Sequence, residues 1–269
     1  MCRLGVRLMA RRVLVLLTSL IFAALVLQPL AALAQVQTPE QFFGFKIGAD
    51  GELARYPKVL EYMQHLAKST DRVKYEELGR STMGAPYVLV TISAPANLAR
   101  MTRLVEINRR LSDPRGLSDA DATKLIAEGR PFYLLFATIH STELGNGQAI
   151  IEVTHRLATD SRPQIREILD NAVLLLVPSQ NPDGQNLVID HWYKTKGTPY
   201  SRSYPDLYHK YVGHDDNRDW FMFTQRETRM MVDKVQNVYK PQITHDMHQQ
   251  GPAASRIFGH SRDAGKLWA

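Results

Sequence analysis

Three side chains of metal-binding type follow apolar stretches of this sequence. His140 and Glu143 form an H-x-x-E step directly after one such stretch, and His248 follows another about a hundred residues later. Two imidazoles and one carboxylate are a ligand set that a catalytic zinc ion takes from a protein, with the fourth position left to water. These residues are therefore candidate zinc ligands. An H-x-x-E step also arises by chance, with the histidine in a core and the glutamate favoured by a helix N-terminus.

The apolar stretches predict where these side chains lie. Residues 132–139 (FYLLFATI) indicate a buried strand, and the apolar spacing that follows Glu143 predicts a helix. Residues 172–177 and 241–247 indicate two further strands, which precede an Asn-Pro-Asp-Gly step at 181–184 and His248. Ligand sites of open α/β sheets lie at the carboxyl ends of the strands. Polar clusters behind three strands therefore predict one common site.

Strands and helices alternate along the chain, which indicates the α/β class. A polar lead-in precedes the first helix, and residues 181–223 are expected to form one long loop. The other expected elements are helices at 57–68, 98–111 and 224–239, a short helix capped by Ser118, and strands at 73–78 and 86–93 joined by a turn at 81–84.

The N-terminus has the pattern of a secretory signal. Four arginines within the first twelve residues precede an apolar stretch at 13–27, and Ala32-Leu33-Ala34 is a small-residue cleavage pattern before Gln35. We expect an exported protein, periplasmic or extracellular, without stable membrane association after cleavage. A retained membrane anchor is the alternative, because the apolar run is long.

Removal of residues 1–34 changes the bulk properties. The formal charge of +6 falls to +2, so we expect no nucleic-acid partner. The single cysteine, Cys2, leaves with the signal, and the mature chain forms no internal disulfide. The expected organisation is a signal at 1–34, a lead-in at 35–54 and one domain at 55–269.

Several motifs together resemble the zinc carboxypeptidase family, in a bacterial exported form. Their order and spacing agree with that family over roughly residues 55–258. The matching motifs are His140-Ser141-Thr142-Glu143, the Asn-Pro-Asp-Gly of 181–184, Asp216-Asn217-Arg218-Asp219-Trp220, His248 and the turn at 77–84.

The resemblance implies an α/β fold with a mixed central sheet flanked by helices, and a hydrolase that removes C-terminal residues from peptides or proteins. It makes His140, Glu143 and His248 the ligands of one zinc ion per chain. Asn217 and Arg218 then hold the terminal carboxylate of the substrate, which a guanidinium fork meets with two parallel hydrogen bonds. The alternative for Arg218 is a surface salt bridge to Asp215, Asp216 or Asp219.

Two substitutions depart from the family pattern near the proposed site. The family carries an arginine just after a tryptophan that follows the Asn-Pro-Asp-Gly step, whereas Trp192 is followed here by Tyr193 and Lys194. Lys194 could take that place as a point charge. Asp219 stands where many members have asparagine, and we expect it to add negative charge beside the carboxylate clamp.

A third departure concerns the general base. The family's base is a glutamate well beyond the third ligand, whereas the only acid after His248 is Asp263 and the last glutamate is Glu227. We expect a C-terminally truncated chain, with an incomplete domain, that lacks this base and binds zinc but hydrolyses peptides poorly. The alternatives are a non-catalytic zinc- or peptide-binding protein on the same fold and a related amino-acid deacylase.

The remaining polar residues near His248 have other expected roles. His245 stands three residues earlier and should point to the opposite face of a regular strand. Asp246 shares the face of His248 and is expected to support its imidazole. His191, His209 and His214 lie in the expected long loop and could line the cleft.

Overall fold

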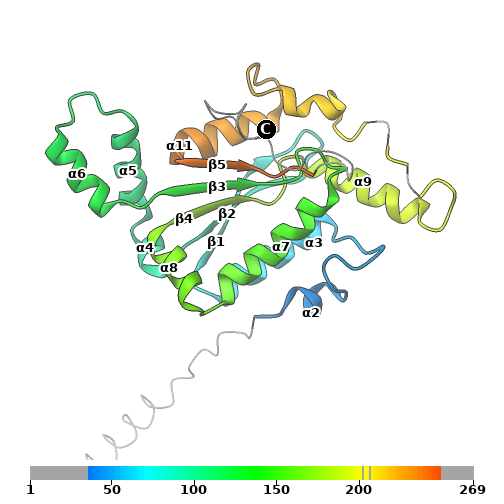
Figure 1. Ribbon diagram of the computed structural model, residues 1–269. Helices are drawn as coiled ribbons and strands as arrows, with labels where there is room; N and C mark the ends of the chain where they lie inside the picture. Colours follow the sequence, from blue (N-terminus) through cyan, green and yellow to red (C-terminus); the bar gives the residue numbers. More distant parts are fainter. Residues whose placement is uncertain (1–35, 202, 206, 250–269) are drawn as a thin grey trace, which may run out of the picture. The chain divides into compact units, whose positions relative to one another are not determined.

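The computed structural model describes residues 36–201, 203–205 and 207–249. These residues form a five-stranded sheet with the order β1-β2-β4-β3-β5 (Figure 1). β1 and β2 form an antiparallel hairpin, β4 is antiparallel to β2, and β3 is parallel to both β4 and β5. The expected mixed sheet is therefore confirmed. The strands are β1 Val73–Arg80, β2 Pro86–Ile92, β3 Phe132–Phe136, β4 Val173–Val177 and β5 Ile243–Asp246.

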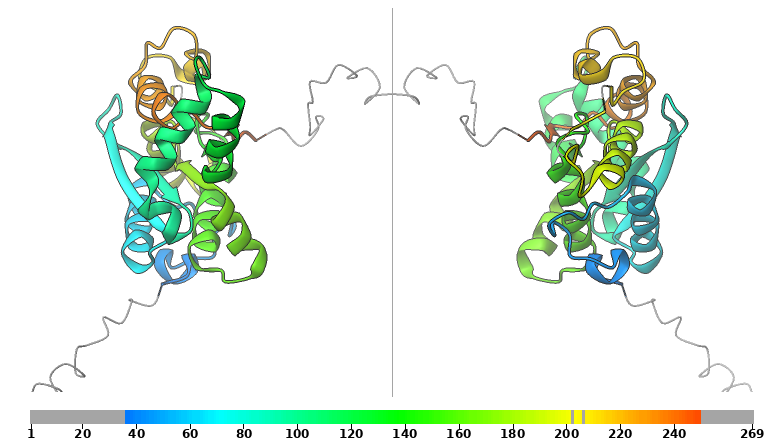
Figure 2. Two further views of the ribbon diagram at one scale, coloured as in Figure 1. Left: turned by 90° about the vertical axis from the view of Figure 1, so that its left-hand side faces the viewer. Right: turned by 90° about the vertical axis from the view of Figure 1, so that its right-hand side faces the viewer.

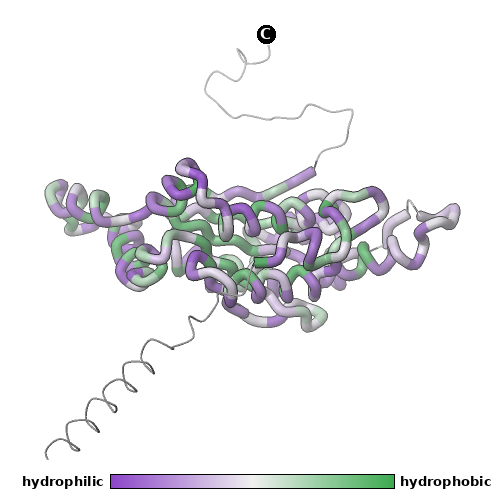
Figure 3. Tube along the Cα trace, turned by 90° about the horizontal axis from the view of Figure 1, so that it is seen from below, coloured by the Kyte–Doolittle hydropathy of each residue, from purple (hydrophilic) through white to green (hydrophobic). Residues whose placement is uncertain are grey.

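The central strands are apolar on both faces because helices cover both faces. β3 reads FYLLF and β4 reads VLLLV, the continuous apolar pattern of buried parallel strands. β1 lies at one edge and carries charged residues (VKYEELGR), which discourage pairing with another chain. In Figure 3 many of the hydrophobic residues lie toward the middle of the described part of the chain, and hydrophilic residues are frequent at its periphery.

Helices pack on both sides of the sheet, as Figure 2 shows. On one side, α3 Tyr56–Ser69, α7 Leu144–Thr159 and α8 Pro163–Asn171 contribute to a core with β2 and β4. On the other side, α5 Met101–Ser112 packs with a π-helical segment, Met231–Gln236. Five further α-helices are α2 Pro39–Phe43, α4 Pro95–Ala99, α6 Asp119–Glu128, α10 Arg226–Met230 and α11 Asn237–Tyr239.

The expected long loop at 181–223 is wrong in its first third. A 14-residue helix, α9 Pro182–Thr195, occupies it, with Pro182 in the first turn. The side chain of Asn181 caps this helix by accepting the N–H of Gly184 (2.9 Å). Asparagine before proline is a helix-start signal, but the many aromatic and polar residues nearby obscured the apolar spacing.

Two other expected helices differ in detail. The helix expected at 98–111 is interrupted at Arg100, which separates α4 from α5. The helix expected from Thr224 is α10, the π-helical segment and α11 in succession, and Gln225 is its N-cap residue. α8 was not expected from the sequence.

The lead-in contributes to the core. Four of its apolar side chains are partly buried against the core, those of Phe42, Phe43, Phe45 and Ile47. The segment is therefore packed on the domain, although its composition indicated a polar lead-in. The proposed signal at 1–34 lies outside the described residues. Among the helices described, none is both long and apolar enough to cross a membrane.

Candidate metal centre

His140, Glu143 and His248 meet at one end of the sheet. Each side chain offers a ligand atom, and these atoms lie within 4.8 Å of one another. His140 and Glu143 lie between β3 and α7, and His248 follows β5 by two residues. Because β3 and β5 are parallel neighbours, their carboxyl ends bring these segments together.

The backbone turns sharply between β3 and His140. Thr138 has φ +58° and is 2% exposed, a left-handed conformation that is rare for a β-branched residue. Its hydroxyl donates to Ser179 Oγ (2.6 Å), next to the end of β4. Such a conformation costs about 1–3 kcal/mol and persists only where its surroundings enforce it. It ends the strand earlier than expected and directs the chain toward Glu143.

Both imidazoles turn the same nitrogen toward the same carboxylate. His140 Nδ1 lies 2.9 Å from Glu143 Oε1, and His248 Nδ1 lies 3.2 Å from Glu143 Oε2. Ligand atoms on a tetrahedral zinc ion are roughly 3.3 Å apart, because each bond is about 2.0–2.1 Å. The donor set and its spacing therefore fit a zinc ion between the three side chains.

Neighbouring groups shift the pKa values of the two imidazoles in opposite directions. The carboxylate of Asp246 lies 2.9 Å from His248 Nε2, which raises the pKa of His248. This is the contact expected from their shared face of the strand. Burial lowers the pKa of His140 and favours the neutral ring, the form that binds a metal. The His140 Nε2 atom is buried and has no partner among the residues described.

His245 points away from the cluster, as the strand geometry predicted. Its Nδ1 atom lies 2.8 Å from the hydroxyl of Tyr133 on β3. His214, by contrast, stacks on His140 with ring centroids 4.0 Å apart, and Tyr208 holds its Nδ1 through a 2.6 Å hydrogen bond. The sequence placed His214 only in the expected long loop, as a residue that could line the cleft.

Asn217 and Arg218 lie beside the cluster, in a 3-10 helix, Gly213–Arg218. Asn217 Nδ2 is 3.5 Å from His248 Nε2, and its Oδ1 accepts the indole N–H of Trp220 (3.1 Å). The exposed guanidinium of Arg218 donates to the carbonyl of Asn217 (2.9 Å). Within the described part of the chain, Arg218 forms no ion pair with Asp215, Asp216 or Asp219.

The charge of Asp219 is not directed at the clamp. Its carboxylate is 2% exposed and accepts the backbone N–H groups of Thr224 and Gln225 (both 2.8 Å). Burial alone would raise its pKa, but these hydrogen bonds hold the pKa of Asp219 below its usual value. The residue therefore organises the start of α10, and its charge next to Arg218 is balanced by these backbone donors.

Lys194 stands apart from the cluster. It is exposed in the last turn of α9, about 18 Å along the helix axis from Pro182 at a rise of about 1.5 Å per residue. His191 on the same helix contacts Ser203. The structure does not bring these two residues to the metal ligands.

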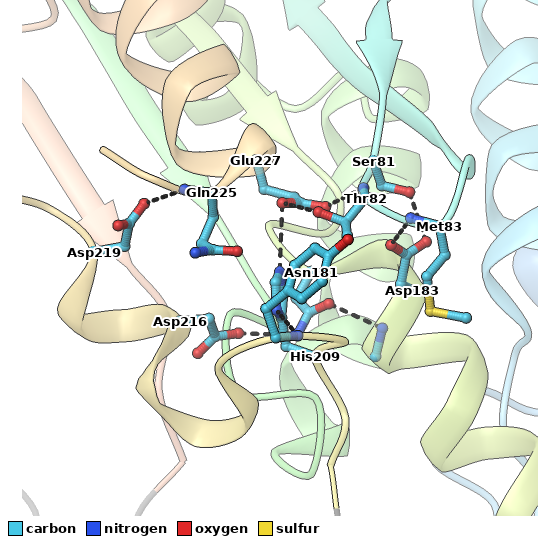
Figure 4. A network of polar contacts seen from close by, with 12 residues as sticks. Ser81, Thr82, Met83, Asn181, Asp183, His209, Asp216, Asp219, Gln225 and Glu227 are labelled. Carbon is cyan, nitrogen blue, oxygen red and sulfur yellow. Dashed lines mark hydrogen bonds and ion pairs between the residues drawn. The ribbon is translucent and has the colours of Figure 1, made fainter. Parts of the chain in front are cut away.

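A buried polar network lies next to the clamp (Figure 4). Asp183 accepts from Ser81 Oγ (2.6 Å) and from the N–H of Met83 (2.7 Å), which joins α9 to the turn between β1 and β2. Glu227 accepts from the N–H of Thr82 (2.6 Å) in the same turn. The Asn-Pro-Asp-Gly step thus supports the framework rather than the metal ligands directly.

His209 occupies the middle of this network and is 1% exposed. Its Nε2 is 3.5 Å from Glu227 Oε2, and its Nδ1 accepts the N–H of Tyr211 (3.3 Å). Burial alone would lower the pKa of His209, but the carboxylates of Glu227, Asp216 and Asp183 raise it. His209 is therefore a packing and electrostatic partner of the network, not a residue lining an open cleft.

The chain is also similar to known proteins. A family model described as zinc carboxypeptidase matches residues 59–266. The structure of carboxypeptidase A from Helicoverpa armigera is 18% identical, with 82% of this chain and 50% of that chain covered at a TM-score of 0.51. A metallo-carboxypeptidase from Burkholderia cenocepacia is 16% identical, with 74% and 42% covered at a TM-score of 0.45.

The chain thus spans about half the length of the first of these structures. No curated protein sequence matches it significantly. The family model covers well over half of the sequence and includes every motif that surrounds the metal cluster. The chain therefore belongs to the zinc carboxypeptidase family.

Proposed function

We propose that this chain carries the metal centre of a zinc metallocarboxypeptidase, which removes residues from the C-termini of peptides. The observation that supports it most is the convergence of His140, Glu143 and His248, whose ligand atoms lie within 4.8 Å. When bound, zinc would supply a water of lowered pKa and would polarise the scissile carbonyl. The three side chains would hold it through two Nδ1 atoms and one carboxylate.

The surrounding residues prepare these ligands. Asp246 accepts a hydrogen bond from the N–H at His248 Nε2, so the lone pair of Nδ1 faces Glu143 and the cation. Burial keeps His140 neutral. The cluster therefore needs little rearrangement to bind a divalent cation.

Arg218 is proposed to recognise the free carboxylate of the substrate, with Asn217 beside it. Its guanidinium is exposed and forms no ion pair with the neighbouring acids among the described residues. Asn217, whose carbonyl it contacts, lies beside the metal ligand His248. A planar fork of N–H donors suits a planar carboxylate. This arrangement would select the last residue of a peptide over an internal bond.

Zinc titration of the purified chain tests the metal centre. We expect one zinc ion per chain, lost in His248→Ala and retained in His245→Ala, because His245 contacts Tyr133 instead. Stoichiometric binding that survives His248→Ala would contradict the assignment.

Release of a C-terminal amino acid tests the reaction. We expect the chain to cleave a peptide with a free C-terminal carboxylate only slowly and in a chelator-sensitive way, because no glutamate follows His248 to act as the expected base. The C-terminal amide should be a still poorer substrate. Zinc binding with no turnover of either peptide would favour a non-catalytic binding protein, and preferred cleavage of N-acyl amino acids would favour a deacylase.

We also propose that the protein acts outside the cytoplasm. The support is the basic and apolar pattern of residues 1–34 and the small residues before Gln35. N-terminal sequencing of the protein from the native host should give a mature chain that begins at Gln35. An intact N-terminus on a membrane-bound protein would favour a retained anchor.

A further inference from the structure

Asp216 is a buried carboxylate one residue before the proposed clamp. It is 6% exposed and lies in the same 3-10 helix as Asn217 and Arg218. Its two oxygens accept different donors. Oδ1 accepts the backbone N–H of Asn217 (2.7 Å), and Oδ2 accepts the side-chain amide of Asn181 (2.9 Å).

The first of these contacts sets the orientation of the clamp. The hydrogen bond from the N–H of Asn217 fixes the peptide plane between Asp216 and Asn217. The carbonyl of Asn217 then accepts from the Arg218 guanidinium (2.9 Å), and its side chain reaches Trp220 and His248. A short chain of contacts therefore runs from the Asp216 carboxylate to both clamp side chains.

The second contact ties this turn to the framework. Asn181 also donates to the carbonyl of Tyr208 (3.2 Å) and caps α9. His209, next to Tyr208, is held against Glu227 on α10. Asp216 is thus the point at which the network drawn in Figure 4 contacts the turn that carries the clamp.

We propose that Asp216 is a positioning residue for substrate carboxylate recognition. It acts through Asn217 and Arg218 and touches neither the substrate nor the metal. The inference rests on the proposed role of Arg218 and extends it to a buried residue. The Asn181–Asp216 hydrogen bond is the attachment that keeps the guanidinium fork in place.

A pair of exchanged side chains provides the test. Asp216→Asn keeps an oxygen that accepts the N–H of Asn217. Its NH2 group then faces the NH2 group of Asn181, so the bond between these two side chains is lost. Adding Asn181→Asp restores one N–H···O bond with the opposite polarity, and the aspartate still accepts from Gly184. It loses the bond that Asn181 donates to the carbonyl of Tyr208. Asp215→Asn is the matched control, because Asp215 is the exposed neighbouring acid in the same turn.

The assay measures the equilibrium binding of two ligands to the full zinc-loaded chain. One is a blocked dipeptide with a free carboxylate, and the other is its C-terminal amide. We expect Asp216→Asn to lower the acid-over-amide preference by about fivefold, the range of one buried hydrogen bond. The exchanged pair should recover part of it, because it restores the bond between residues 181 and 216 but not the bond to the Tyr208 carbonyl. Zinc stoichiometry and the preference of Asp215→Asn should stay at wild-type values.

Three results would overturn the proposal: an unchanged preference in Asp216→Asn, an equal loss in Asp215→Asn, or a loss in Asp216→Asn that is accompanied by loss of zinc and is not recovered by the exchanged pair. A wild-type chain with no preference would instead refute the clamp. Hydrogen exchange of the Asn217 amide then decides on Asp216. Faster exchange in Asp216→Asn, reversed in the exchanged pair, supports its positioning role, and unchanged exchange contradicts it.

Discussion

Replacing Asp246 by asparagine should weaken zinc binding without removing a ligand. Asp246 Oδ2 lies 2.9 Å from His248 Nε2, on the side of the ring opposite to Glu143. Carboxylates in this position hold the ring and increase its basicity, and their loss costs about 10–100-fold in metal affinity. The side chains of Asp246 and His248 are 25% and 34% exposed, so solvent screens part of the interaction. We expect a loss near tenfold, or about 1.4 kcal/mol.

Competition with a chromophoric zinc chelator at pH 8 measures this loss. The pH matters because Asp246 raises the pKa of His248. In the wild type a proton therefore competes with zinc more strongly as the pH falls, and this competition weakens when the carboxylate is removed. The wild-type advantage should be largest at pH 8 and smaller at pH 6.

His245→Ala is the matched control, since His245 lies on the same strand and contacts Tyr133. It should bind zinc within about twofold of the wild type. An Asp246→Asn affinity within that range at pH 8, or an equal loss in His245→Ala, would refute the reasoning.

Three further predictions concern the clamp, the framework and pH. In a complete enzyme, Arg218→Lys should weaken cleavage of a free-acid peptide by at least about tenfold and leave cleavage of its C-terminal amide nearly unaffected, because an ammonium cannot match the guanidinium fork. Equal losses on both peptides in steady-state kinetics would contradict the clamp. Gly184→Ala should lower the free energy of unfolding, measured by urea denaturation, by about 3 kcal/mol, since its Cβ would overlap the carbonyl of Tyr208. Gly145→Ala is the control and should change it little, because only the flexible end of Gln249 lies nearby. Burial raises the pKa of Asp216 to about 8, so the folded state holds this proton more tightly than the unfolded state and the free energy of unfolding should fall as pH rises from about 4 to 8. Asp216→Asn should show a shallower decline over that window, and an identical decline in both proteins would contradict the assignment.

The metal cluster was predicted from local strand signals together with the resemblance of the motifs to the zinc carboxypeptidase family, which implied the three ligands. Continuous apolar runs identified β3 and β4, and polar residues at their carboxyl ends followed from the chain order. Strand periodicity predicted the contact between His248 and Asp246 and the opposite placement of His245, although β5 ends at Asp246 and His248 lies beyond it. The strand end at Phe136 was misjudged by three residues, because the left-handed turn at Thr138 has no sequence signal.

The buried network could not be predicted in this way. Asp183 and Ser81 are 102 residues apart, and Glu227 and Thr82 are 145 residues apart. Nothing in the local pattern around Glu227 distinguishes a network partner from an ordinary acid at the start of a helix. Pairings over such separations depend on the assembled fold, which also places His214 against His140.

Among the described strands, β5 is a short one at the end of the sheet, and zinc affinity therefore depends on how stably it pairs with β3. β5 contributes only Ile243–Asp246, pairs with β3, and is followed after two residues by His248. Any population in which β5 leaves β3 removes His248 from the other two ligands. The measured dissociation constant would then equal the intrinsic one divided by the docked fraction, as in conformational selection. Substitutions that only loosen the β3–β5 pairing should therefore behave, in a binding experiment, as mutations of the metal centre.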